Sequence, residues 1–157
     1  MLVTYHSDLT VRFRDLSAQL LQSSDTSPLQ ASYPNPLPPL TIDVLSLLAD
    51  PSVSSRTSPK LIEEAQIASS HLAPQSLECA VALRSGEIAI FRMAPEPTGD
   101  AAIPRTLDDP EIISATHVST GEHRRFQPHF LLAAGRGPVS AVALSDIGTS
   151  SLCSTLM

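Results

Sequence analysis

The sequence lacks the segments that place a chain in or across a membrane. No apolar stretch approaches the roughly 20 residues that a membrane-spanning helix requires. The start, Met1-Leu2-Val3, has neither the basic segment nor the apolar core of a secretory signal. We therefore expect a cytoplasmic protein.

Cysteine and basic residues are also scarce. The chain of 157 residues has two cysteines, Cys79 and Cys153, too few for a disulfide framework. Cys79 lies in an apolar run and is predicted to be a buried free thiol. Lys and Arg number 10 against 16 Asp and Glu, giving a formal charge of −6. This balance argues against a general nucleic-acid binder, because phosphate affinity needs clustered basic residues.

Recognisable catalytic and cofactor motifs are missing as well. Gly135-Arg136-Gly137 lacks the Gly-Lys-Ser/Thr ending of a phosphate loop, and no nucleophile elbow is present. The acidic run 108–111 contains a proline and is expected to be a solvated loop. His117, His123 and His129 are evenly spaced, but no carboxylate or thiolate completes a metal-ligand set. We predict no catalytic, cofactor-binding or metal residues, with a small hydrolase or metal enzyme on an open β-sheet as the alternative.

What the sequence does contain is a repeated strand–turn–strand pattern. The run 79–92 has two short apolar strands joined across Ser85-Gly86 and ends in Arg92. The run 3–15 follows the same plan, with alternating apolar residues at Leu9, Val11 and Phe13. Repeated strand pairs with tight turns are typical of the blades of a β-propeller.

The strands in this pattern differ in their expected burial. Cys79–Leu83 and Ile88–Phe91 are nearly continuous in apolar residues, which indicates strands buried on both faces. Further strands are predicted at 112–118, at 130–134 and after Gly137-Pro138, the last with one face formed by Val139, Ala141 and Ala143.

Prolines and serines interrupt the strands with long loops. The sequence has 14 prolines and predicts loops at 22–40, 50–60 and 94–110. A short helix is expected over 42–48, with Thr41 as its N-cap and a buried face of Ile42, Leu45 and Leu48. The stretch 61–72 has helical spacing and is ambiguous between helix and strand. Residues 149–157 are polar and aperiodic, and we predict a disordered tail or the product of a truncation.

At three segments the chain resembles the family of lethal giant larvae and tomosyn proteins, most of all its fungal WD-repeat regulators of exocytosis. The segments are Thr10–Leu21, Leu77–Phe91 and Phe130–Gly148. The strand in the first segment ends in Phe-Arg-Asp. The resemblance covers nearly all of residues 1–148, in order. It implies that 62–69 is the inner strand of a blade.

The resemblance also implies a function. Members of this family have two consecutive seven-bladed propellers that bind plasma-membrane SNAREs of the syntaxin and SNAP-25 classes. They regulate vesicle docking, exocytosis and cell polarity without catalysis. The expected location is accordingly the cytoplasm, with peripheral association at the plasma membrane.

Two departures from the family pattern limit what is expected of this chain. Arg14 stands where the repeat usually carries tryptophan. A blade needs about 40–45 residues, so we predict an all-β fold of about two WD40-like blades with flanking strands and one short helix. Residues 1–148 are then an internal piece of a larger protein. The alternatives are a propeller segment of another cytosolic WD-repeat scaffold, or a fragment with no function alone.

Two surface features are candidates for regulation or contact. Ser27 and Ser58 each precede a proline in a loop and could accept proline-directed phosphorylation, although Ser-Pro is common in loops. His123, Arg124 and Arg125 could touch an acidic SNARE surface or lipid headgroups, with a solvated turn as the alternative.

Overall fold

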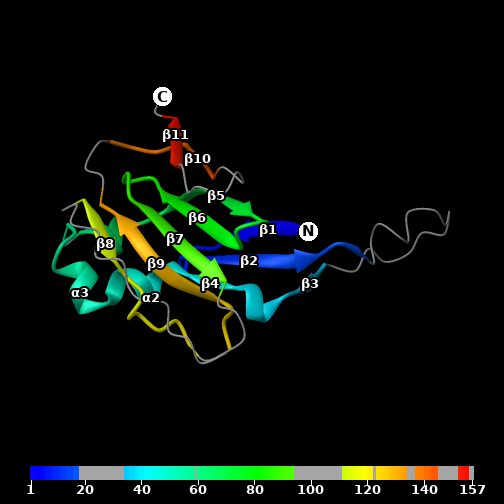
Figure 1. Cartoon of the computed structure of the whole chain (residues 1–157). Coiled ribbons are helices and arrows are strands. Elements are labelled where there is room, and N and C mark those ends of the chain that lie inside the picture. Colours follow the sequence, from blue (N-terminus) through cyan, green and yellow to red (C-terminus); the bar gives the residue numbers. More distant parts are fainter. Residues whose placement is uncertain are drawn as a thin grey trace.

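The computed structural model describes residues 1–17, 34–58, 60–93, 111–121, 123–133 and 137–144, and the backbone of 152–155. Figure 1 shows the elements, which follow one another as β1 (Leu2–Tyr5), β2 (Thr10–Asp15), β3 (Asn35–Pro36), the 3-10 turn η1 (Pro38–Leu40), β4 (Ile42–Asp43), α2 (Val44–Ala49), α3 (Pro51–Ser54), α4 (Leu61–Glu64), β5 (Ile67–Ala73), β6 (Glu78–Leu83), β7 (Ile88–Met93), β8 (Ile112–Ser114), β9 (Phe126–Leu132), β10 (Ala141–Leu144) and β11 (Leu152–Thr155).

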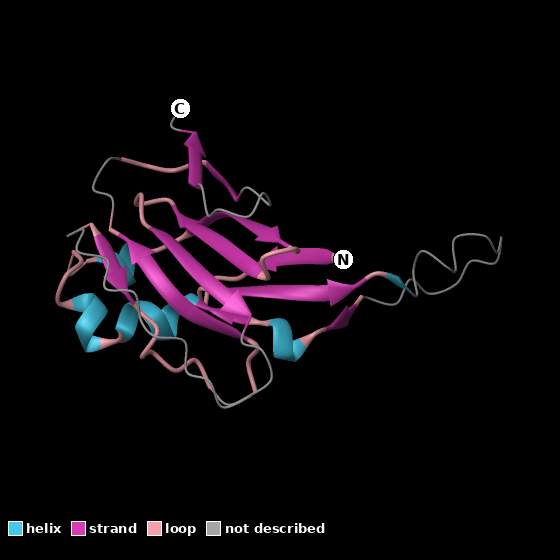
Figure 2. Ribbon diagram, viewed as in Figure 1, coloured by secondary structure: helices cyan, strands magenta, loops and turns pink. Residues whose placement is uncertain are grey.

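The strands form antiparallel sheets that follow one another along the chain. The N-terminal sheet has the order β1-β2-β3, with β4 also beside β2. The middle sheet has the order β5-β6-β7-β9-β8, and β10 and β11 form a C-terminal hairpin. Figure 2 shows that the short helices lie at the ends of the strands and cover little of the sheets. The expected all-β, partial propeller-like fold is confirmed.

The middle sheet is buried on both faces, as predicted for its central strands. Every residue of β6 is buried. One face of β6 and β7 packs on the N-terminal sheet, through Cys79, Val81, Leu83, Ala89 and Phe91. The other face packs on β10, through Ala80, Ala82, Ile88 and Ile90. Because each face needs its own apolar cover, the sheets stack one upon the next, as propeller blades do.

Strand register shows that the strand–turn–strand plan is repeated in space, although Arg14 is equivalent to Phe91 and not to Arg92, with which the sequence pattern aligned it. Tyr5 pairs with Val11 across the first hairpin, and Ala82 pairs with Ile88 across the second. Both pairs enclose five residues, so Val11 is equivalent to Ile88. Val11 packs toward the middle sheet and Ile88 packs toward β10. The two hairpins therefore turn equivalent faces toward the sheet that follows them.

Two polar contacts join neighbouring sheets. The backbone N–H of Ser70 in β5 donates a hydrogen bond to the Tyr5 hydroxyl of β1 at 3.0 Å. The backbone N–H of Leu144 in β10 donates to Nδ1 of His71 in β5 at 3.0 Å. Both contacts are made by β5, which is an edge strand of the middle sheet. The β5 edge is thus tied to the sheets on either side of it.

Cys79 is a buried free thiol, in agreement with the sequence. It lies on the face of β6 that packs on the N-terminal sheet and is fully enclosed. Burial raises the pKa of the Cys79 thiol to about 12, because a thiolate would lose its hydration there.

The helical region differs from its prediction in three respects. Asp43, not Thr41, caps α2, because its carboxylate accepts hydrogen bonds from the backbone N–H and the hydroxyl of Ser46. The buried side chains of α2 are Val44, Leu47 and Leu48, whereas Leu45 is 39% exposed. The start of the helix is two residues later than predicted, and this shifts its buried face. Helix α3 lies where a loop was predicted, and α4 falls in the ambiguous stretch 61–72.

The ambiguous stretch 61–72 contains both structures. Leu61–Glu64 forms α4, and Ile67–Ala73 forms β5. The strand implied by the family resemblance, 62–69, therefore exists but begins at Ile67. Leu61 is 4% exposed and anchors α4 in the main core.

The bounds of other elements also differ from those predicted from the sequence. Strand β8 ends at Ser114, and β9 begins at Phe126, earlier than predicted. Pro128 is accommodated in β9 because the ladder with β7 shifts register beside it and β8 pairs only with Phe130–Leu132. The predicted loop 22–40 contains β3 and η1, and the loop 50–60 contains α3.

The C-terminal part corrects two expectations. In β10 the buried residues are Val142 and Leu144, whereas Ala141 and Ala143 are exposed. Val139 is buried but lies before the strand begins. The face on which Val139 lies therefore does not predict the face on which Ala141 and Ala143 lie. Residues 152–155 form β11, although a disordered tail was predicted. Main-chain pairing with β10 requires no apolar alternation.

Candidate interaction surfaces

One end of the sheets carries the helices α2–α4 and two of the described turns, and we call it the loop end. It consists of the turn 6–9, helices α2–α4 and the turn 84–86. The backbone N–H of Val44 donates to the carbonyl of Leu9, which places the start of α2 beside the first turn. The backbone N–H of Arg84 donates to the carbonyl of Gln66, which places the entry to β5 beside the second. A hollow of about 360 Å³ lies between the first turn and the entry to β5.

Side-chain caps hold helices α2 and α3, and the loop end presents apolar residues to solvent. Asp50 caps α3 through the backbone N–H of Ser52, and Pro51 occupies the first helical position. Leu45 of α2 and Ile62 of α4 are 39% and 38% exposed. These two helices pack against each other, so the loop end offers apolar side chains on adjacent short helices.

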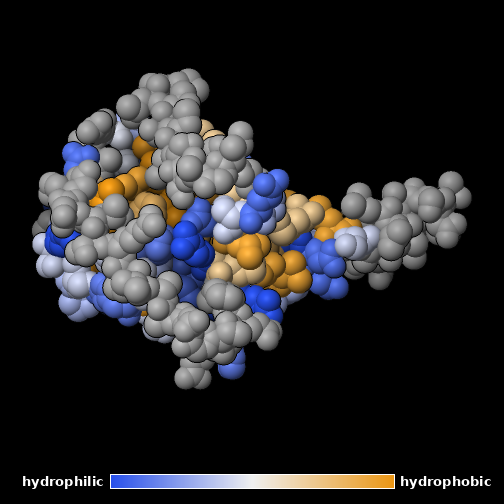
Figure 3. Space-filling model, in the orientation of Figure 1, coloured by the Kyte–Doolittle hydropathy of each residue, from blue (hydrophilic) through white to orange (hydrophobic). Residues whose placement is uncertain are grey.

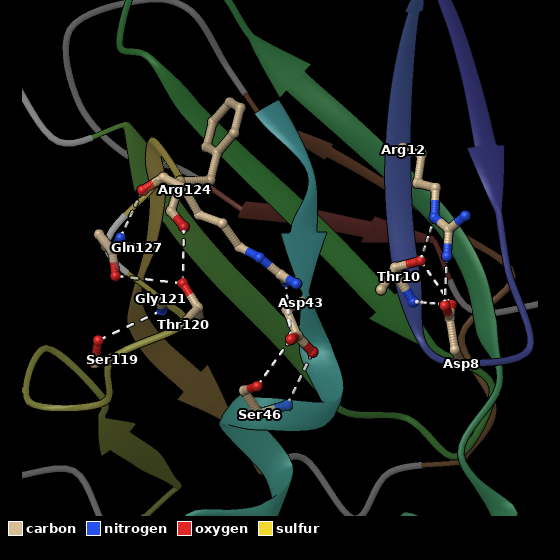
Figure 4. Close-up of polar contacts among 11 residues, drawn as sticks. Asp8, Thr10, Arg12, Asp43, Ser46, Ser119, Thr120, Gly121, Arg124 and Gln127 are labelled. Carbon is tan, nitrogen blue, oxygen red and sulfur yellow. Dashed lines mark hydrogen bonds and ion pairs between the residues drawn. The ribbon is translucent and has the colours of Figure 1, made fainter. Parts of the chain in front are cut away.

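The Asp43 carboxylate holds the base of α2 by two interactions. It caps the helix at Ser46, and it forms an ion pair of 2.8 Å with Nη1 of Arg124. Figure 4 shows the Arg124 side chain reaching across to the carboxylate. The backbone N–H of Arg125 donates to the carbonyl of Pro39. Arg124, which the sequence offered as a candidate surface contact, is therefore engaged in an ion pair within the fold.

Replacing Asp43 separates these two interactions. Asp43→Ala is expected to lower the free energy of unfolding by about 1–2 kcal/mol, because the cap and the ion pair are both lost. Asp43→Asn is the matched control, since asparagine caps as well as aspartate and only the ion pair is lost. Urea denaturation followed by circular dichroism measures both. Equal destabilisation by the two variants would show that the cap contributes little.

A serine, a histidine and an aspartate meet at the loop end, but their geometry is not that of a catalytic triad. Nε2 of His117 lies 2.6 Å from the Ser52 hydroxyl and 3.7 Å from Oδ1 of Asp50. The Ser52 hydroxyl itself donates to Asp50. A triad needs the serine and the carboxylate on opposite ring nitrogens, whereas here both face the same one. The hydrogen bonds from Ser52 are the main reason that the pKa of Asp50 is lowered.

The evenly spaced histidines do not form a metal site. Among the described residues, no group of three His, Cys, Asp or Glu side chains could hold a metal ion. His117 belongs to the cluster above, and His123 lines a surface hollow. His129 lies on β9 against the Phe130 ring, and partial burial, followed by the charge of Arg92, lowers its pKa.

The remaining candidate residues are partly placed. Ser58 is exposed, and its carbonyl accepts the backbone N–H of Leu61. The hydroxyl of the neighbouring Thr57 donates hydrogen bonds to the carbonyls of Val53 and Ser54. Of the acidic run 108–111, only Glu111 is among the described residues. Of Gly135-Arg136-Gly137, only Gly137 is described, and its φ is +102°. Ser27, 108–110, 135–136 and the loop 94–110 lie outside the described residues.

A polar cluster that the sequence analysis missed lies on the N-terminal sheet. Oδ1 of Asp8 accepts from the backbone N–H and the hydroxyl of Thr10, and its Oδ2 pairs with Nη2 of Arg12 at 2.5 Å. Nε of Arg12 donates to the Thr10 hydroxyl at 2.9 Å (Figure 4). The Thr10 hydroxyl is the main reason that the pKa of Asp8 is lowered. The i, i+2 spacing of Asp8, Thr10 and Arg12 was the available signal.

Beside this cluster is a hollow of about 490 Å³. Its lining includes Thr10 and Arg12 of β2, prolines of β3 and η1, and the side chains of His123 and Arg124. Figure 3 shows hydrophobic and hydrophilic surface intermingled over the described elements on the face that it draws.

Comparison with known families identifies a match over most of the described β-structure. Residues 64–153 match the family described as "Lethal giant larvae (Lgl) like, C-terminal". This segment is more than half of the chain and includes the whole middle sheet, β10 and the first two residues of β11. No curated protein matches the chain. In the part of the chain that the structure describes, no helix is long and apolar enough to cross a membrane.

Proposed function

Because this chain belongs to the Lethal giant larvae-like family, we propose that it is a non-catalytic interaction module of a WD-repeat regulator of exocytosis. Its partners are plasma-membrane SNAREs of the syntaxin and SNAP-25 types, and through them it acts in vesicle docking and cell polarity. The protein works in the cytoplasm and associates peripherally with the plasma membrane. The family match is the observation that carries this proposal.

The geometry supports an interaction role over a chemical one. In the described residues, the one Ser-His-Asp cluster has both partners on a single ring nitrogen of His117. The stacked sheets are rigid elements, and the loop end displays segments of varied sequence on them. Contacts in such folds are made by loops held on a rigid scaffold.

We place the SNARE contact at the loop end. SNAREs associate through amphipathic helices, and such helices bind apolar side chains that are surrounded by polar ones. Leu45 and Ile62 are the exposed apolar side chains on the packed helices α2 and α4. Leu77, which is 47% exposed, lies in the turn between β5 and β6, at the opposite end of the strands.

The test is binding of the purified chain to the cytosolic domain of a syntaxin-type SNARE, measured by isothermal titration calorimetry. Binding is expected, and Leu45→Asp with Ile62→Asp should weaken it by about tenfold or more. Leu77→Asp is the matched control and should leave the affinity unchanged. Absence of binding by the unaltered chain contradicts the proposed function. Equal loss in the control contradicts the placement at the loop end.

A further inference from the structure

The C-terminal hairpin is held on the middle sheet by apolar packing and by a hydrogen bond to a histidine. Strand β10 lies across β5 and β6 (Figure 1). Its Val142 and Leu144 belong to the apolar cluster on that face of the sheet. The hydrogen bond runs from the backbone N–H of Leu144 to Nδ1 of His71 on β5. Because this contact involves a titratable ring, the docking of β10 is linked to protonation.

The contact fixes the protonation state of the His71 ring. A backbone N–H is always a donor, so Nδ1 of His71 must be the acceptor and cannot itself carry a proton. Turning the ring over would place the carbon Cδ2 against the Leu144 N–H, and this carbon is no acceptor. The neutral ring with its proton on Nε2 therefore satisfies Leu144. The doubly protonated ring does not, because both of its nitrogens are donors.

One ion pair lies on the same face of the middle sheet as His71. Side chains alternate along a strand, and His71 pairs with Ala80, so Glu78 is the charged residue of β6 on this face. Its carboxylate is bound by Arg92 of β7, whose Nη2 lies 2.5 Å from Oε1. His129 of β9 lies near the same pair, since both charges act on it. The charge of Glu78 is therefore already balanced by Arg92.

The other neighbours of His71 bring no charge. Strand β10 consists of Ala141–Leu144, and β11, Leu152–Thr155, has no acidic or basic residue. The N-terminal sheet lies against the opposite face of β5, where Tyr5 contacts Ser70. Among the described residues, no unpaired carboxylate thus faces the His71 ring. A positive charge on this ring would be added beside apolar side chains, where an uncompensated charge is destabilising.

We infer that His71 is a pH-sensitive latch, which holds β10 on the middle sheet while its ring is neutral and releases β10 when the ring gains a second proton. Protonation removes the acceptor for the N–H of Leu144, a residue that is 8% exposed. It also places a charge beside the apolar residues that β10 covers. The latch is therefore closed at neutral pH and opens as the pH falls from about 7 to 5, where histidine titrates. Neither Leu45 nor Ile62 takes part, so the latch does not depend on the SNARE proposal.

The first test records the ring nitrogens of His71 in a long-range proton–nitrogen NMR spectrum of the whole chain at about pH 7.5, where histidine is mostly neutral. The expected spectrum shows a proton on Nε2 and an unprotonated Nδ1. A proton on Nδ1 would overturn the inference, because that ring has no acceptor for Leu144. This test requires no variant.

The second test follows hydrogen exchange of the Leu144 amide, expressed as protection relative to an unfolded chain at the same pH. Protection at about pH 5.5 should be lower than at about pH 7.5 by roughly fivefold or more. The amide of Val81, in the central strand β6, is the internal reference and should lose much less protection. Unchanged protection of Leu144 contradicts the latch. Equal loss at both amides does so too, because it means that the whole fold weakens.

Two variants separate the acceptor from the titration. His71→Asn places its Oδ1 where Nδ1 lies, since both atoms are the same number of bonds from the backbone, but it takes up no proton in this range. Protection of the Leu144 amide should then be high at both pH values. His71→Leu has no acceptor and should give low protection at both. The matched control, His123→Asn, removes an exposed histidine and should respond to pH as the unaltered chain does.

The variants also state what would contradict the latch. A full pH response in His71→Asn, or loss of the response in His123→Asn, would show that another group is responsible. If His71→Asn fails to fold, which its circular dichroism spectrum will show, the ring-nitrogen spectrum and the exchange of the unaltered chain decide the question.

Discussion

Phe13→Ala is expected to lower the free energy of unfolding by about 3–5 kcal/mol, the range for removing a buried aromatic ring. Phe13 is 1% exposed and links the N-terminal and middle sheets, because its ring stacks on Phe126 of β9 at 5.9 Å between centroids. Domains of this size are stable by about 5–15 kcal/mol. The variant therefore loses a large share of its stability, which urea denaturation measures.

The control for this prediction is Leu77→Ala, which removes an apolar side chain that is 47% exposed. It should change the stability by no more than about 0.5 kcal/mol. A loss below about 1 kcal/mol for Phe13→Ala would mean that the ring does not hold the two sheets together. A double-mutant cycle with Phe126→Ala should show a coupling of about 0.5–1.5 kcal/mol from the stacked pair.

Exchanging residues between equivalent positions should have very unequal effects. Phe91→Arg places a guanidinium between two apolar sheet faces, and it should cost at least about 3–5 kcal/mol, because the buried charge has no partner. Arg14→Phe places the same ring on the face of β2 that is turned away from the middle sheet, and it should change stability by no more than about 1 kcal/mol. Thermal unfolding of the two variants makes the comparison.

Arg14→Phe should have a different consequence. It enlarges the apolar area on the face of the N-terminal sheet that is turned away from the middle sheet, so self-association that depends on protein concentration is expected in sedimentation velocity runs. The unaltered chain at the same concentrations is the reference. Tolerance of Phe91→Arg together with unfolding of Arg14→Phe would show that the two hairpins are not equivalent.

Hydrophobic pattern in the sequence was sufficient to predict the central strands. The uninterrupted apolar residues of β6 and β7 signal burial on both faces, and the structure has a sheet on either side. The pattern was insufficient where a cap or a loop sets the phase. Asp43, rather than Thr41, begins α2, and in β10 the buried side chains are Val142 and Leu144. Such differences of one or two residues depend on hydrogen bonds and on contacts with distant strands.

The surfaces were less predictable than the core. Arg124 was a sensible candidate for an external contact, yet Asp43, which is far away in the sequence, engages it. The spatial equivalence of the two hairpins could not be recognised by pattern, because Arg12 and Arg14 match an ordinary solvent-facing side of a strand. Their significance depends on the register that makes them equivalent to Ala89 and Phe91.

The strand order of the middle sheet bears on how the chain is made. Strand β9 lies between β7 and β8, although β8 precedes it in the sequence. During synthesis, β8 therefore leaves the ribosome while the edge of β7 is still open and its proper neighbour is not yet available. The native sheet forms only after β9 has paired with β7 and β8 has added to the far side of β9. Premature pairing of β8 with β7 is then a trap that nascent chains must escape, and slower translation between the two strands prolongs it.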